Sequence, residues 1–173
     1  MSDDGARASF ALNPQGFNDY RFDQVFLGRS EDGGFLARQV SQTEGGFKTA
    51  FGSPFANTTG NSNNFILALN LKADLPFRLP LRIPLKPYFD IGYFDDATPL
   101  GRSRPLKEQL LWSGGLMLEF LNGGLEVYFP VAHARLLRDR YAEVPGKNYL
   151  RQVSWSIRIG RVAPMDVIQK LAN

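Results

Sequence analysis

Residues 63–76, NNFILALNLKADLP, alternate between apolar and polar side chains, and this alternation decides the fold class. A period of two predicts a β-strand whose two faces meet different environments. A soluble sheet would place a core on one face and water on the other, whereas an outer-membrane barrel would place lipid on one face and a polar lumen on the other. The apolar face would carry Phe65, Leu67, Leu69, Leu71, Ala73 and Leu75, and the other face Asn64, Asn70, Lys72 and Asp74, with Ile66 and Ala68 as apolar exceptions.

Turn signals divide the rest of the chain into further short strands. Asn122-Gly123 lies between two apolar runs and predicts a hairpin with a type I′ turn, because both central residues of that turn need positive φ. Pro80, Pro84 and Pro87 would interrupt an interior ladder, so residues 76–87 are expected to form a turn or an edge. The candidate strands are residues 8–12, 20–27, 63–76, 87–94, 110–121, 125–131 and 149–159.

Two segments near the C-terminus have a different character. Residues 135–147 are charged and loop-like, with room for a helical turn, and residues 164–171 form an amphipathic pattern with Pro164 in the first turn. The predicted fold is therefore all-β, an antiparallel meander forming a barrel or part of a barrel, with a short C-terminal helix. The expected divisions are a polar N-terminal segment at 1–19, an antiparallel β domain at 20–162 and the helix at 163–173.

Composition excludes several classes of protein. The chain of 173 residues suits one domain, contains no cysteine and has a net charge of only +3, so disulfides, thiolate metal sites and a nucleic-acid footprint are not expected. The N-terminal sequence Met-Ser-Asp-Asp-Gly lacks the features of a signal peptide, so a chain destined for the envelope would be expected to be a fragment of a longer precursor.

The C-terminal region is basic. Beyond residue 131, eight Lys and Arg side chains face three acidic ones. This excess is compatible with an anion-facing surface, but charged loops and strand ends explain such an excess more often. The residues are Arg135, Arg138, Arg140, Lys147, Arg151, Arg158, Arg161 and Lys170 against Asp139, Glu143 and Asp166.

Catalytic signatures are missing from the sequence. The single histidine, His133, has no second histidine for a zinc motif, and it is predicted to have a structural or solvent-facing role. No nucleophile elbow or phosphate-binding glycine loop occurs. No catalytic, cofactor-binding or metal-binding residue is therefore predicted.

Two groups of carboxylates are candidate sites. Asp90, Asp95 and Asp96 could gather around calcium, but a solvated turn is the preferred interpretation. Glu119 and Glu126 flank the hairpin and could lie near each other across the ladder, where a surface or lumen position is preferred over a catalytic pair.

Six phrases, taken together and in order, resemble one family. They are FLGRSEDGGFLARQ (26–39), EGGFKTAFG (44–52), NNFILALNLKADLP (63–76), PLKPYFDIGYF (84–94), GGLEVYFPV (123–131) and WSIRIGRVAPMDVIQKL (155–171). They resemble the C-terminal β-rich region of large Bacteroidetes cell-envelope proteins of the M1 metallopeptidase type, from about residue 20 to the end. The phrases are strand-and-turn motifs and not catalytic signatures.

The resemblance implies an outer-membrane location and an upstream zinc aminopeptidase-like domain, followed by half or more of an outer-membrane-type barrel. The family's zinc ligands and general-base glutamate have no counterpart in this sequence, so any peptidase activity would lie outside the chain.

The sequence therefore predicts a non-catalytic β-barrel-like module of a bacterial envelope protein, anchoring or supporting an upstream metallopeptidase-like domain. Its expected partner is a lipid bilayer or detergent, with no nucleic acid. The alternative is a free-standing soluble β-sandwich or barrel that binds a ligand or a protein. Strand length favours the first, because membrane strands need about 9–11 residues and soluble strands average about 5–6. Residues 64–75 and 149–159 reach the longer range, and Arg151 would lie near the start of the second, where an interfacial arginine costs only about 0–1 kcal/mol.

Overall fold

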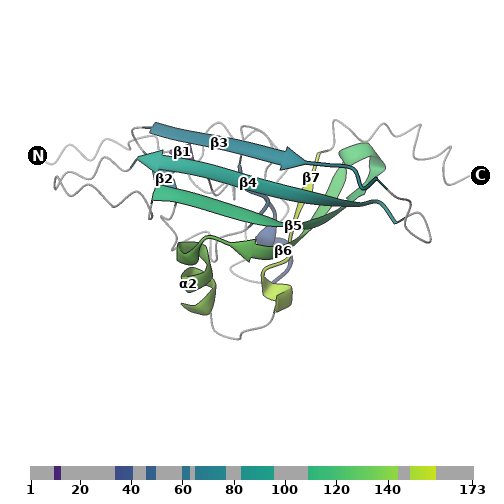
Figure 1. Ribbon diagram of the computed structural model, residues 1–173. Coiled ribbons are helices and arrows are strands. Elements are labelled where there is room, and N and C mark those ends of the chain that lie inside the picture. The colour runs from purple at the N-terminus through teal and green to yellow at the C-terminus, as the bar shows by residue number, and fades with distance from the viewer. Residues whose placement is uncertain are drawn as a thin grey trace, which may run out of the picture.

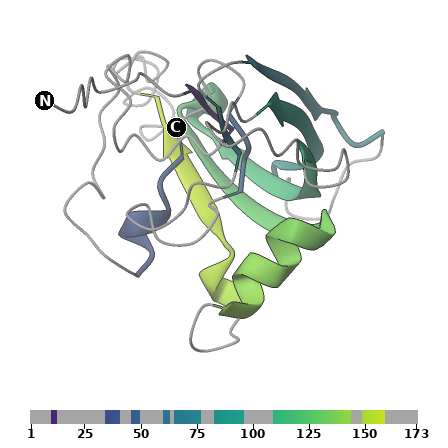
Figure 2. The same cartoon turned by 90° about the vertical axis from the view of Figure 1, so that its left-hand side faces the viewer.

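The computed structural model describes residues 10–12, 34–40, 46–49, 60–62, 65–76, 83–95, 109–143 and 149–158. Its main feature is a five-stranded antiparallel meander in the order β3-β4-β5-β6-β7, curled into a half-barrel (Figures 1 and 2). The predicted all-β antiparallel class is thus confirmed. The strands are β3 Phe65–Lys72, β4 Leu85–Asp95, β5 Leu110–Phe120, β6 Leu125–His133 and β7 Ser154–Ile157, and a separate two-stranded sheet pairs β1 Phe10–Ala11 with β2 Asn61–Ser62.

Of the alternating residues 63–76, Phe65–Lys72 form β3; residues 73–76 lie beyond the strand, and residues 63–64 lie outside the described residues. The pairing of β3 with β4 and of β4 with β5 keeps side chains of one kind opposite each other across the sheet. Leu69 lies opposite Ile91 of β4, which in turn lies opposite Trp112 of β5. The neighbouring row contains Asn70 and Asp90. Because directly opposed residues share one face of a sheet, the first row lies on one face and the second row on the other.

The hairpin between β5 and β6 forms where the sequence predicts it. Asn122 and Gly123 have positive φ values of 57° and 82°, as a primed turn requires. The connection is longer than a two-residue turn, however, because Leu121 also has a positive φ of 54° and the amide of Gly124 donates to the carbonyl of Leu121. The short 3-10 turn η4, Leu121–Gly123, is this connection.

Pro87 lies within a strand, as the candidate strand at 87–94 predicts, and the strand begins two residues earlier, at Leu85. Pro87 is the third residue of β4 and lies opposite Leu116 of β5. The strand tolerates it because β3 pairs with β4 only as far as Lys72 and Tyr88, so the missing amide falls at the end of that ladder. Pro130 of β6 lies at a register shift between Gly114 and Gly115, which is another position where a sheet accepts proline.

Residues 135–147 contain more regular structure than predicted. The helix α2, Arg135–Glu143, follows β6 directly, where the sequence analysis allowed only a helical turn. Leu137 is fully buried, and Arg135 and Asp139 form an ion pair one turn apart. The helix therefore has one packed side and one charged side, as an amphipathic surface helix requires.

The predicted strand at residues 149–159 is wrong at its beginning. Residues Tyr149–Arg151 form the 3-10 turn η5, closed by a bond from the Gln152 amide to the Tyr149 carbonyl, and β7 begins only at Ser154. Arg151 consequently belongs to a turn and not to a sheet face. A similar 3-10 turn, η1, spans Leu36–Arg38 and follows Gly34, whose φ is 82°.

Other predictions lie outside the described residues. These are the strand at 20–27, the C-terminal helix at 163–173 and most of the N-terminal segment. Of the candidate strand at 8–12, the structure describes residues 10–12, and Phe10–Ala11 form β1.

Gly114 and Gly115, where the register of β5 and β6 shifts in a β-bulge, allow a test of this part of the sheet. A Cβ on Gly115 would collide with the backbone carbonyl of Phe129 and lie 2.8 Å from Pro130 Cα, whereas a Cβ on Gly114 would meet the Phe89 ring at 3.1 Å. We expect Gly115→Ala to destabilise the fold towards the upper end of the ~1–3 kcal/mol that overpacking costs, because backbone cannot move aside easily. Gly114→Ala should cost less than ~1 kcal/mol, and equal shifts of the two denaturation midpoints would contradict this account of the bulge.

Candidate functional site

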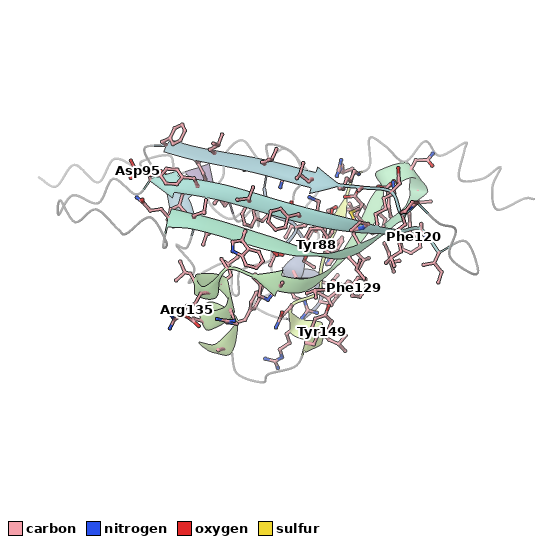
Figure 3. All side chains as sticks on the ribbon, in the orientation of Figure 1. Tyr88, Asp95, Phe120, Phe129, Arg135 and Tyr149 are labelled. Carbon is pink, nitrogen blue, oxygen red and sulfur yellow. The ribbon has the colours of Figure 1, made fainter. Side chains whose placement is uncertain are left out.

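One face of the sheet, the outer face, is apolar and exposed. Among its members, Leu67 is 61% exposed and Leu69 is 54% exposed. A contiguous apolar surface of this extent on a protein marks an interaction site. The outer face comprises Phe65, Leu67, Leu69 and Leu71 of β3, Phe89, Ile91 and Tyr93 of β4, Leu110, Trp112, Leu116, Leu118 and Phe120 of β5, Leu125, Val127 and Phe129 of β6, and Ile157 of β7 (Figure 3).

Aromatic side chains pair across the strands of this face. The Phe65 and Tyr93 rings lie 6.3 Å apart, next to the end of β4, and the Phe89 and Trp112 rings stack at 6.0 Å. Such pairs stabilise neighbouring strands. Phe65 and Tyr93 also occupy the end of the apolar band, where aromatic girdles occur in membrane barrels.

The opposite, inner face is mostly buried, and it mixes polar and charged side chains with the core residues Phe94, Leu111 and Met117. Its members include Asn70, Tyr88, Asp90, Ser113, Glu126, Tyr128, Ser154 and Ser156. Segment 46–49 lies against this face, together with Leu12. What distinguishes this sheet from a soluble sheet with one solvated face is the other, exposed face, which is apolar where a soluble sheet would carry polar residues.

A buried ion pair joins segment 46–49 to the centre of the inner face. Lys48 Nζ lies 2.6 Å from Asp90 Oδ1, and the Lys48 amide donates to Asp90 Oδ2 at 2.7 Å. Asn70 Nδ2 donates to Asp90 Oδ1 at 2.8 Å and to the Gly46 carbonyl at 3.1 Å. The Asp90 side chain is 0% exposed, so each of these bonds compensates for lost hydration of a charged group.

Hydroxyl groups extend this contact to the neighbouring strands. Thr49 Oγ1 hydrogen-bonds to Ser113 Oγ of β5 at 2.6 Å and lies 3.5 Å from the Tyr88 hydroxyl of β4. Ser154 of β7 donates to the Lys48 carbonyl at 2.5 Å. Segment 46–49 is therefore bound to β3, β4, β5 and β7 at once.

Apolar packing continues the inner face towards the end of β4. Phe47 is fully buried with Leu12, Phe94 and Leu111. Gly92 leaves the space for this contact, because a Cβ there would lie 2.7 Å from a Leu12 methyl and 2.9 Å from the Phe47 ring.

The two glutamates beside the hairpin lie opposite each other, as the sequence suggests, and are ion-paired. Lys72 Nζ bridges Glu119 at 3.0 Å and Glu126 at 3.2 Å. Lys86 adds a 3.1 Å contact to Glu119, and Arg158 adds a 3.0 Å contact to Glu126. Three cations thus surround two carboxylates in a network of ion pairs.

The aspartate group considered for calcium does not assemble. Asp90 points to the inner face, while Asp95 lies on the alternate row opposite Phe65 and accepts from Gln109 Nε2 at 3.3 Å. The preferred expectation of a solvated turn is wrong for Asp90, which is buried, and Asp96 is outside the described residues. Within the described ranges, no group of three or more His, Cys, Asp or Glu side chains is placed to hold a metal ion.

His133 packs against the helix that follows β6. Its ring lies 5.1 Å from the Tyr141 ring, and the histidine is half-buried. Burial raises the pKa of the Tyr141 hydroxyl. These contacts suit a structural role for both rings.

Comparisons with known proteins give no assignment. No family model matches the chain, and neither a curated protein nor a solved structure matches it. Among the helices that the structure describes, none has the length and apolar character needed to cross a membrane. The resemblance to M1-type envelope proteins stays a prediction.

Lys48 and Asp90 were not singled out as a pair by the sequence analysis. The sequence does contain a signal for Asp90, which stands between Phe89 and Ile91 in an otherwise apolar run. A charge at that position either faces a lumen or has a buried partner. The sequence does not identify Lys48 as its partner, because Lys48 lies 42 residues earlier in the chain.

Removing one charge of the buried pair tests its importance. Asp90→Asn should destabilise the fold by about 3–5 kcal/mol, because it leaves Lys48 buried without a counter-charge. Adding Lys48→Met to Asp90→Asn should recover part of that loss in denaturant unfolding. The control Arg135→Gln breaks an exposed pair and should change stability by no more than about 1 kcal/mol. A double variant less stable than Asp90→Asn would disprove the electrostatic explanation.

Proposed function

We propose that this chain is a non-catalytic β-barrel-like module of a bacterial envelope protein, with its outer face in contact with the hydrocarbon of a lipid bilayer. One observation carries the proposal: the exposed face of the sheet is apolar, and the buried face carries ion pairs and hydroxyl groups. Membrane barrels have this distribution, because lipid lies outside the sheet and polar groups lie inside.

The energetics of the two faces support lipid over water. Complete burial of a leucine side chain contributes about 1.5–3 kcal/mol, and because Leu67 and Leu69 are a little over half exposed, an apolar medium covering them would contribute about 1–2 kcal/mol each. The inner face needs no such medium, because its charges are already paired within the chain.

Strand dimensions agree with the proposal. β4 and β5 each contain eleven residues. At about 3.3 Å per residue and a tilt near 45°, such strands span roughly 25 Å, the height of the apolar band in outer-membrane barrels. The predicted long strand at 149–159 contains only the four-residue strand β7. The argument from strand length therefore depends on β4 and β5.

The anchoring role and the outer-membrane location rest on the resemblance quoted above. It supports an upstream zinc-peptidase-like domain held at the membrane by this sheet. The residues of this chain would then contribute attachment and not chemistry.

A charge introduced at a lipid-facing position should lower stability by an amount that depends on its depth in the bilayer. Leu69→Arg, near the middle of β3, should lower the stability of protein refolded in bilayers by about 2–4 kcal/mol, and Phe65→Arg, at the strand end, by about 0–1 kcal/mol. Measurement is by urea unfolding in phosphatidylcholine vesicles. The unmodified protein is also expected to require detergent to stay monodisperse. A monodisperse monomer in plain buffer whose stability is unchanged by Leu69→Arg would favour the soluble alternative.

The purified chain is expected to show no peptidase turnover. Its single histidine packs on Tyr141, and Glu119 and Glu126 are held by lysine and arginine side chains. The assay uses zinc and a panel of aminoacyl substrates. Turnover that survives purification and is lost in His133→Ala would refute a non-catalytic role.

A further inference from the structure

The sheet ends in two edge strands, β3 and β7, and they differ in what covers them. At β7, Gln39 forms a parallel bridge with Trp155, and the Val40 amide donates to the Trp155 carbonyl at 2.8 Å. At the other side of the meander, β3 is paired by β4 alone among the described residues (Figure 1). An open edge of this kind presents a row of amide and carbonyl groups that another strand can bind.

β3 lacks the features by which edge strands usually avoid other strands. It is eight residues long, contains no proline, and pairs with β4 without a bulge from Phe65 to Lys72. Its single charge, Lys72, stands at the last position, and the Lys72 side chain is bound across the inner face by Glu119 and Glu126. Natural sheets protect exposed edges with prolines, bulges or charges, so a long, regular and largely apolar edge is expected to be paired.

The exposure of the outer face increases towards this edge. All four outer residues of β3 are 50% or more exposed, whereas Phe89 of β4 and Leu116 of β5, on the same face, are 39% and 38% exposed. The difference arises because β3 has a neighbouring strand on one side only. A strand added along β3 would cover the bare flank of these side chains.

The hydrogen bonds of β3 identify the backbone groups that point away from the sheet. The Ala73 amide donates to the Pro87 carbonyl of β4 at 3.1 Å, so the odd-numbered residues direct their amides and carbonyls towards β4. The Phe65 amide agrees with this direction, because it donates to Ser62 Oγ, which in turn donates to the Asp95 carbonyl of β4. The even-numbered residues therefore present their backbone groups to the open edge. They are Ile66, Ala68, Asn70 and Lys72.

We propose that β3 pairs with β3 of a second copy of this chain, antiparallel and about a two-fold axis at Leu69. The four outward-pointing residues are centred on Leu69. This register therefore brings Ile66 opposite Lys72 of the second copy, and Ala68 opposite Asn70 of the second copy. Each of these pairs can exchange two backbone hydrogen bonds. The inference concerns the edge of the sheet and does not depend on the proposed function.

Side-chain chemistry favours an antiparallel copy of the same strand. Opposite residues share a face in such a pair, so Leu67 lies opposite Leu71 of the second copy, and the two Leu69 side chains face each other. The two Lys72 residues lie at opposite ends of the joined strands, whereas a parallel pair in register would place them side by side. A two-fold axis is also the commonest symmetry of homo-oligomers, and it lets each copy complete the edge of the other.

The joined sheets keep their faces on the same sides. Because the two-fold axis is perpendicular to the sheet, the apolar outer faces of the two copies become continuous, and so do the inner faces. Within a bilayer this pairing has an additional effect, because unpaired backbone groups cannot be hydrated in hydrocarbon. The dimer thereby extends the surface proposed to contact lipid and removes the open edge beside it.

Cysteine cross-linking tests the register. The chain contains no cysteine, so a single introduced cysteine can form a disulfide only with the same position of another copy. Leu69→Cys, Leu67→Cys and Leu116→Cys are prepared in the full chain, refolded in detergent micelles and oxidised with copper phenanthroline. Leu67 shares the strand and the face of Leu69, and Leu116 lies on the same face in β5, so both positions are matched controls.

We expect Leu69→Cys to give roughly tenfold more disulfide-linked dimer than Leu67→Cys or Leu116→Cys. The Cα atoms of a facing pair that is not hydrogen-bonded lie about 4.5 Å apart, within the reach of a disulfide. The two Leu67 positions would be offset by about four residues, or roughly 13 Å. Leu67→Cys and Leu71→Cys, refolded together, should cross-link with each other.

Other yields would overturn the inference. Similar dimer yields at all three positions would indicate contact between outer faces and not between edges. Strong cross-linking of both Leu69→Cys and Leu67→Cys, without Leu116→Cys, would indicate parallel pairing. Little dimer from Leu69→Cys would refute the two-fold pairing, and so would the mass of one chain for the unmodified protein in sedimentation equilibrium in density-matched detergent. Each of these results leaves the proposed lipid contact standing, because the stabilities of Phe65→Arg and Leu69→Arg in bilayers test it separately.

Discussion

The buried contact between Lys48 and Asp90 is the interaction on which the rest of the structure depends. A carboxylate with no solvent exposure in the middle of a sheet would be very unfavourable by itself. Lys48 supplies the counter-charge and a backbone donor, and Asn70 supplies a third bond. These bonds fix segment 46–49 against the concave side, so the hydroxyl chain through Thr49 and the packing of Phe47 follow from the same placement.

This arrangement separates the tasks of the two faces. The inner face obtains its stability within the chain, through the Asp90 centre and through the network around Glu119 and Glu126. The outer face contributes cross-strand aromatic pairs but leaves most of its apolar area for a partner. In such a sheet the strand register is strongly specified. A shift by one residue would expose charges to that partner and bury leucines among ion pairs. Lipid as the partner is the proposal that this separation supports.

The sequence predicted the features that depend on local pattern. The alternation in residues 63–76 gave β3 its two faces, and Asn122-Gly123 marked the β5–β6 hairpin, because both signals act within a few residues. Features that depend on distant contacts were missed or misread. Lys48 and Asp90 meet across 42 residues, and no local signal states which charges will be paired. Residues 149–151 alternate like a strand yet close a 3-10 turn before β7. The helix α2 was underestimated because adjacent leucines between arginines obscured the helical period.

The long separation of these contacts also sets the order in which the molecule can form. Ser154 binds the Lys48 carbonyl across 106 residues, and Trp155 binds the Phe35 carbonyl across 120 residues. Until β7 has emerged from the ribosome, the early segments lack the partner that holds them beside the sheet. Contacts of this range also make folding slow, because a long loop must close before they form. The neighbouring strands of the meander can pair as they appear, whereas the contacts of segments 35–40 and 46–49 with β7 can form only after the whole sheet is present.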